Sequence, residues 1–141
     1  MAAGMGVCLV LAAAATASHP ATTFLAIERF TLAWTHSIEK VRWEEDYEVA
    51  RTATSDARPV LRATESRVRG SAAGMEPPAS AVLRNGWYAY PPAQRHPGAL
   101  RLSRSEFVPD YELCTHGVCQ PLSQWLPSDG GVTLLTACHA P

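Results

Sequence analysis

The residues best suited to chemistry lie close together in the first third of the chain. His36 and Ser37 precede a segment in which apolar and acidic residues alternate, and Glu45 falls on the apolar side of that alternation, beside Trp43. A period of two is typical of a half-buried β-strand, so we expect Glu45 to point inward. An inward carboxylate has to be paired, protonated or part of a site. The sequence therefore gives His36, Ser37, Trp43 and Glu45 as candidate binding residues.

The same residues leave a catalytic reading open. A small hydrolase could use His36 as a base, with Glu45 orienting it and Ser37 as the nucleophile. Adjacent residues of an extended chain point to opposite sides, however, and the sequence has no Gly-x-Ser-x-Gly elbow. We therefore assign no catalytic residue, and we favour a binding role over an enzyme.

A glycine-rich stretch from Gly70 to Pro78 forms the second candidate region. It lacks the Gly-Lys-Ser/Thr ending and the following helix that a phosphate-binding loop needs, so nucleotide binding is not predicted. A loop of this length can still close over a ligand. Gly74 and Glu76 are therefore added to the candidate binding residues, and no cofactor is predicted.

Cysteine spacing predicts a disulfide. Cys114 and Cys119 flank a four-residue turn, and residues opposite each other in a hairpin are within disulfide range. A rival interpretation joins both thiols with His116 and Cys138 in a zinc site. Export would favour the disulfide, so no metal site is predicted. Cys138 is then left without an assigned partner.

The first 17 residues resemble a secretory signal peptide. They form an uncharged apolar run that ends in Ala15-Thr16-Ala17, and the run is too short to span a bilayer. We therefore expect a signal peptide over 1–17, a single domain over 18–141, a periplasmic or secreted location, and no membrane span after cleavage. With 12 basic and 13 acidic residues, the chain has no positive field for nucleic acid.

Short alternating segments separated by Pro, Gly, Asn, Asp and Ser recur from Phe24 onward. This pattern predicts an all-β fold, an antiparallel sandwich or barrel of about eight short strands. A hairpin over 30–49 would place Trp34 opposite Trp43 and Leu32 opposite Glu45. An acidic segment over 39–48 precedes an arginine-rich one over 58–69, so we expect ion pairs between adjacent strands on the solvent side.

Several ordered motifs resemble one family of exported bacterial proteins, domain of unknown function 1850. They are, in order, Trp34-Thr35-His36-Ser37-Ile38-Glu39, Trp43-Glu44-Glu45, the stretch from Gly70 to Pro78, Gly86-Trp87, Arg104-Ser105 and Leu113-Cys114 to Cys119. The resemblance implies an association with TRAP transporters of the TAXI type, which import organic acids with an extracytoplasmic binding protein. It carries over no catalytic residue.

Three functional hypotheses follow. The first is an exported accessory or ligand-binding protein whose partners are subunits of a TRAP/TAXI transporter or its substrate-binding protein. The second is a small periplasmic hydrolase that uses His36 and Glu45. The third is a structural interaction domain without a small ligand.

Overall fold

The computed structural model describes residues 4–35, 40–53, 57–70 and 79–141. These residues form two antiparallel sheets and two single-turn 3₁₀ helices, η1 (Ala12–Ala14) and η2 (Leu122–Gln124). The four-stranded sheet has the order β2 (Thr23–Leu25), β1 (Met5–Leu11), β11 (Val132–His139) and β8 (Leu100–Ser103). The seven-stranded sheet has the order β10 (Val118–Pro121), β9 (Glu112–Thr115), β3 (Arg29–Thr35), β4 (Arg42–Arg51), β5 (Pro59–Arg69), β7 (Trp87–Tyr90) and β6 (Val82–Arg84). The all-β sandwich predicted from the sequence is confirmed.

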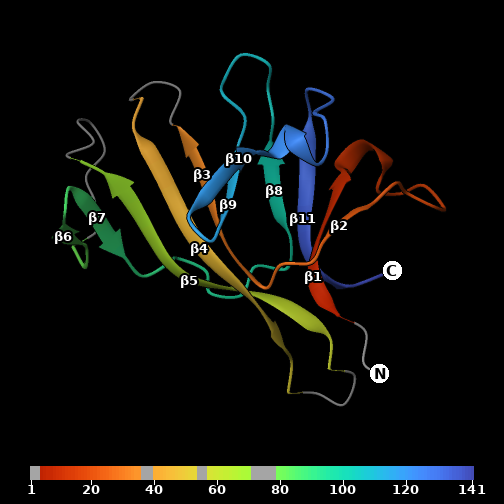
Figure 1. Ribbon diagram of the computed structural model, residues 1–141, viewed down its shortest axis with the longest axis horizontal. Helices are drawn as coiled ribbons and strands as arrows, with labels where there is room; N and C mark the ends of the chain where they lie inside the picture. Colours follow the sequence, from red (N-terminus) through yellow and green to blue (C-terminus); the bar gives the residue numbers. More distant parts are fainter. Residues whose placement is uncertain (1–3, 36–39, 54–56, 71–78) are drawn as a thin grey trace.

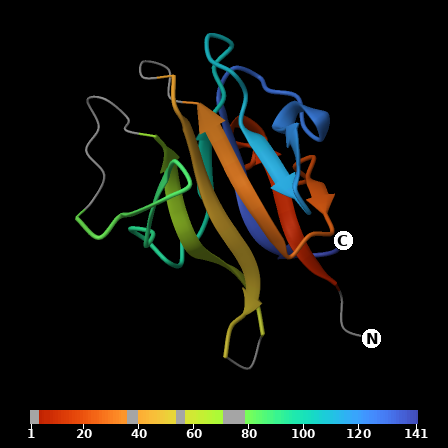
Figure 2. The ribbon, with the colours of Figure 1, turned by 60° about the vertical axis from the view of Figure 1, so that its left-hand side comes forward.

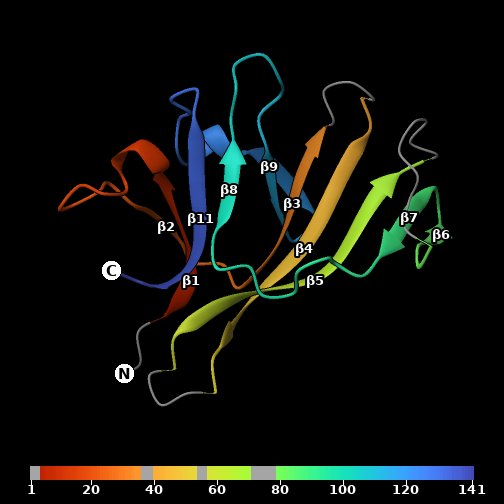
Figure 3. The ribbon, with the colours of Figure 1, turned by 180° about the vertical axis from the view of Figure 1, so that it is seen from behind.

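The core lies between the sheets. The four-stranded sheet contributes Val7, Leu9 and Leu135, and the seven-stranded sheet contributes Leu32 and Leu61, among other side chains with almost no exposure. Burial of such aliphatic side chains is the main force that holds the two layers together. Figures 1 and 3 show the four-stranded sheet at one side of the molecule and the β6–β7 hairpin at the other.

The start of the chain is built into this core. β1 lies between β2 and β11, it pairs with β11 from Met5 to Leu11, and a disulfide joins Cys8 to Cys138. Cys138, which the sequence left without an assigned partner, is therefore bonded to Cys8. Removal of residues 1–17 as a signal peptide stays a prediction, but in this structure the segment supplies a central strand.

Two further strand expectations are corrected. The alternation over 24–35 predicts one strand, but the segment forms two, because Phe24 pairs with Cys8 in the four-stranded sheet whereas Arg29–Thr35 pairs with β4 in the other. The described residues contain eleven strands rather than about eight. The difference arises near the start of the chain, where β1 overlaps the predicted signal peptide and the segment over 24–35 forms β2 and β3.

The expected hairpin register is confirmed. Trp34 pairs with Trp43, and Leu32 pairs with Glu45. A bulge follows in the neighbouring strand, since Asp46 pairs with Glu65 but Tyr47 pairs with Ala63. The bulge adds one residue to β5 and keeps the apolar residues of that strand facing the core on both sides of it.

The strands turn where the sequence carries residues suited to a left-handed backbone. Asn85 and Gly86 have φ angles of 51° and 83° between β6 and β7, and Figure 2 shows this hairpin at the edge of the larger sheet. These angles are those of a type I′ turn, as Asn-Gly predicts. No helix in the described part of the chain is long and apolar enough to cross a membrane.

Candidate functional site

Glu45 lies in a row of side chains that crosses five strands on the inner face of the seven-stranded sheet. Directly paired residues of an antiparallel sheet point to the same side. The pairings place Glu45 beside Leu32 and Ser66, and the row continues to Leu113 at one end and Tyr90 at the other. Leu32 and Leu113 are buried, so the row leads from the core to the carboxylate.

Two hydroxyl groups hold the Glu45 carboxylate. The Tyr47 hydroxyl donates to Oε1 at 2.9 Å, and the Ser66 hydroxyl donates to Oε2 at 3.1 Å. Tyr47 and Ser66 are buried, whereas Glu45 is partly exposed. Among the described residues, no arginine or lysine forms an ion pair with Glu45. The negative charge of Glu45 is therefore met by neutral donors in this part of the chain.

Aromatic residues lie on the same sheet face as Glu45. Trp34 and Trp43 are stacked with ring centroids 6.3 Å apart, and Tyr111 lies 6.0 Å from Trp34 in a tilted arrangement. The predicted Trp34–Trp43 pair is thus confirmed. The buried Trp43 Nε1 has no hydrogen-bond partner among the described residues. The rings of Trp34, Trp43 and Tyr111 are partly exposed.

The charge of Glu45 acts on three tyrosines. Burial, followed by the negative charge of Glu45, raises the pKa of Tyr47 far above its usual range. The same two causes, in the same order, raise the pKa of Tyr90 and of Tyr111. All three phenols therefore stay protonated and can donate hydrogen bonds at neutral pH.

The structure covers part of the predicted site. Trp43 and Glu45 lie on one face of β4, and the inward direction of Glu45 is confirmed by its partners Tyr47 and Ser66. The other candidates, His36, Ser37, Gly74 and Glu76, lie outside the described residues. Sequence reasoning missed Ser66, Tyr90 and Tyr111. The period-two pattern of β5 was available for Ser66, whereas the tyrosines join the site only through pairing and packing between distant segments.

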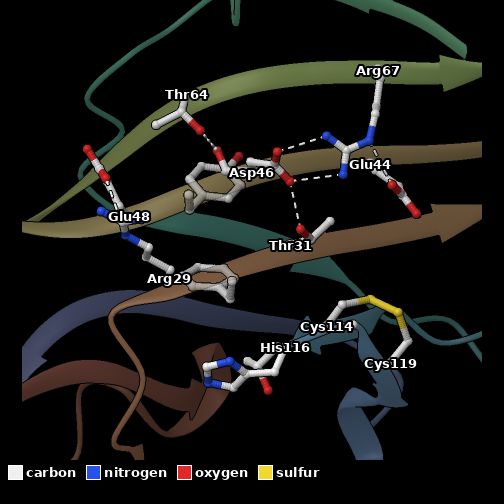
Figure 4. Close-up of a pocket in the computed structure, with 14 residues that line it drawn as sticks. Arg29, Thr31, Glu44, Asp46, Glu48, Thr64, Arg67, Cys114, His116 and Cys119 are labelled. Carbon is white, nitrogen blue, oxygen red and sulfur yellow. Dashed lines mark hydrogen bonds and ion pairs between the residues drawn. A yellow bond between two sulfur atoms is a disulfide. The ribbon is translucent and has the colours of Figure 1, made fainter. Parts of the chain in front are cut away.

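The outer face of the same sheet carries the predicted ion pairs. Arg67 contacts both oxygens of Asp46 at 2.8 and 3.0 Å and Glu44 at 2.8 Å, and Arg62 pairs with Glu48. A groove of about 620 Å³ runs beside these residues, and Figure 4 shows Glu44, Asp46 and Arg67 on one side of it and the Cys114–Cys119 disulfide on the other. The hydrogen bonds to Asp46 raise the pKa of the Arg67 guanidinium. The carboxylates of Glu44 and Asp46 together hold this guanidinium in place.

The second disulfide joins the β9–β10 hairpin at Cys114 and Cys119, as predicted, with Cα atoms 4.0 Å apart. Arg42 Nη2 lies 3.8 Å from Cys114 Sγ and 3.6 Å from Cys119 Sγ. Arg42 is itself held by Glu44 at 2.8 Å and by Glu112. The rival zinc site is wrong, because all of its cysteines are disulfide-bonded, and the described residues contain no metal-binding cluster.

A third polar cluster is structural. The Arg104 side chain is 1% exposed, and it contacts both oxygens of Asp110 at 3.0 Å and Thr133 Oγ1 at 3.0 Å. Asp110 also accepts hydrogen bonds from the backbone N–H groups of Tyr111 and Ser123. Arg104 thus ties β11 to the segment that carries Tyr111 into the inner-face site.

One comparison with known proteins identifies a family. A family model described as a domain of unknown function (DUF1850) matches residues 30–122. This range contains Glu45, Ser66, Tyr90 and Tyr111 as well as the Cys114–Cys119 disulfide, whereas β1 and β11 lie outside it. Comparison with curated proteins and with solved structures finds no match.

Proposed function

The chain belongs to the DUF1850 family, and from that premise and the inner-face geometry we propose that it is an exported binding module for a small organic ligand. The observation that carries the proposal is the Glu45 carboxylate, which is partly exposed, held by two neutral hydroxyls and located on the same sheet face as the stacked Trp34 and Trp43. Keeping a partly buried charge without an ion pair costs folding free energy, and a ligand of opposite charge gives a physical reason for the presence of Glu45.

The chemistry of the site favours a cationic group on the ligand. The faces of Trp and Tyr rings attract cations, and a carboxylate beside them adds a full negative charge. The pair Trp34 and Trp43 gives the site flat aromatic surfaces, and the hydroxyls of Tyr47 and Ser66 fix the orientation of Glu45. A primary or quaternary ammonium group fits this combination.

Two features support an exported location and a transporter partner. The two disulfides are consistent with an oxidising compartment such as the periplasm or the extracellular space. The family resemblance implies work beside TRAP transporters of the TAXI type. The proposed partners are therefore the membrane subunits of such a transporter or its substrate-binding protein. The hydrolase alternative depends on His36, which lies outside the described residues.

Titration of the full-length protein with simple probes tests the ligand class. Choline and propylammonium should quench tryptophan fluorescence and raise the melting temperature of the wild-type protein, and Glu45→Gln should abolish both effects. Glu65→Gln is the matched control, because Glu65 lies on the outer face beside Arg67 and Arg84. Binding of dicarboxylates in preference to the amines, unchanged in Glu45→Gln, would overturn the site assignment.

Co-purification tests the partner separately. The tagged protein should retain TRAP transporter subunits from detergent-solubilised membranes of its native cell, and mass spectrometry should identify them. Recovery without these subunits, from cells that express the transporter, would reject the transporter link and leave the ligand test unaffected.

A further inference from the structure

We propose that the Cys114–Cys119 disulfide is a thiol-exchange site that accepts two electrons from a dithiol partner. This proposal concerns the outer face of the seven-stranded sheet and is independent of the ligand at Glu45. It rests on three observations, namely the exposure of one sulfur-bearing residue, a guanidinium group against both sulfurs, and a groove that gives access to them.

The two cysteines differ in access. Cys119 lies in β10, where every residue is exposed, whereas Cys114 is 8% exposed in β9. Both cysteines line the groove, and Figure 4 shows the disulfide at its margin. An incoming thiolate therefore reaches Cys119 Sγ first, and Cys114 becomes the leaving thiolate.

Arg42 is placed to stabilise that leaving thiolate. Its Nη2 lies within 4 Å of both sulfurs, and its side chain is held from two sides by Glu44 and Glu112. A nearby guanidinium lowers the pKa of a cysteine thiol, and a leaving thiol with a lower pKa departs faster. The two carboxylates offset part of the positive charge, so removing one of them should strengthen the effect of Arg42.

The exchange balances without any further reagent. A thiolate of the partner attacks Cys119 Sγ, the Cys114–Cys119 bond breaks, and its electron pair leaves with Cys114 as a thiolate. The second thiol of the partner, after loss of its proton, attacks its own sulfur in the mixed disulfide and releases Cys119. The partner ends as a disulfide, and the protons from its two thiols are taken up by Cys114 and Cys119.

The Cys8–Cys138 disulfide is an internal control. It joins two paired strands of the other sheet, with both residues partly buried, and no arginine contact to its sulfurs is found in the described part of the chain. With dithiothreitol as the probe, followed by acid quenching, alkylation and peptide mass spectrometry, Cys114–Cys119 should be reduced about tenfold faster than Cys8–Cys138.

Charge variants separate a built site from simple exposure. Loss of the guanidinium should raise the pKa of Cys114, and a less acidic leaving thiol departs more slowly, so Arg42→Gln should slow reduction of Cys114–Cys119 by about threefold or more. Glu112→Gln should accelerate it. Arg62→Gln is the matched control, since Arg62 lies on the same face and, among the described residues, forms its ion pair with Glu48.

Two results would overturn the proposal. One is equal reduction rates for the two disulfides in the wild-type protein. The other is an unchanged rate in both Arg42→Gln and Glu112→Gln. If Arg42→Gln fails to fold, as judged by circular dichroism, the opposite change expected in Glu112→Gln still decides the question.

Discussion

Removal of β1 is the sharpest test of how the N-terminal segment contributes to the fold. The segment was predicted to be a signal peptide, yet in the structure its residues Val7 and Leu9 have no exposure and Cys8 is bonded to Cys138. The perturbation is deletion of residues 1–17 in a chain that also carries Cys138→Ala. Its matched partner is the full-length Cys8→Ala/Cys138→Ala variant, which has the same free-cysteine content but keeps the strand.

The expected losses are large. Burial of Val7 and Leu9 stabilises the fold by ~1.5–3 kcal/mol each. The Cys8–Cys138 disulfide has a sequence separation of 130 residues, and closing a loop of that size contributes ~5 kcal/mol on the chain-entropy model. The deletion therefore removes about 8–11 kcal/mol before the backbone pairing of β1 with β11 is counted, against a typical total of ~5–15 kcal/mol.

Urea unfolding and near-ultraviolet circular dichroism measure the result. The double cysteine variant should stay folded, with a melting temperature lower by roughly 15 °C, since a chain of this length has an unfolding entropy of ~0.3 kcal/mol/K. The deletion variant should lack cooperative unfolding. A deletion variant that unfolds cooperatively within a few degrees of the double cysteine variant would refute the reasoning, and residues 18–141 would then form the domain as the sequence predicts.

Three further predictions concern single residues. Burial and the charge of Glu45 raise the pKa of Tyr47 in the folded state, so the unfolded state loses this proton first as the pH rises, and stability falls above about pH 10. Tyr47→Phe should make that fall in the free energy of unfolding shallower. Urea unfolding at a series of pH values measures the slope. Arg104→Met should lower the free energy of unfolding by ~3–5 kcal/mol, because it removes a buried cation and leaves the partly buried Asp110 without its partner, whereas Arg101→Met on the exposed side of β8 should change it by less than about 0.5 kcal/mol. Gly86→Ala should cost ~1–2 kcal/mol in thermal unfolding because φ is +83° there, and Gly98→Ala, where an added Cβ meets no atom within 4 Å and φ is not left-handed, is the control.

Local alternation predicts more of this fold than any other signal. The period of two along β4 predicts the inward direction of Glu45, and with a short connection it also predicts the pairing of Trp34 with Trp43. The opposite charges of neighbouring segments predict the outer ion pairs, which Arg67 forms with Asp46. Each of these inferences concerns residues that are close in sequence, where strand geometry alone fixes the neighbours.

Contacts between distant segments could not be predicted in the same way. A short apolar run at the start of a chain has the same composition whether it is a buried strand or a signal peptide, so β1 and its disulfide to Cys138 were missed. Tyr111 reaches Trp34 only because β9 pairs with β3, a pairing with no local signature. The sequence does not distinguish Arg104 from a surface arginine, because Asp110 and Thr133 contact it only in the folded chain.

β4 connects the two proposed sites and also keeps them apart. Glu45 points to the inner face, where Tyr47 and Ser66 hold it, whereas Glu44 points to the outer face and holds Arg42 against the disulfide. A shift of the register by one residue would exchange these faces, and the paired tryptophans Trp34 and Trp43 oppose such a shift because it would move them out of the inner face. Because the backbone of β4 lies between the two carboxylates, ligand binding at Glu45 and thiol exchange at the disulfide are separate properties. Each of the two proposals is therefore tested by its own experiment.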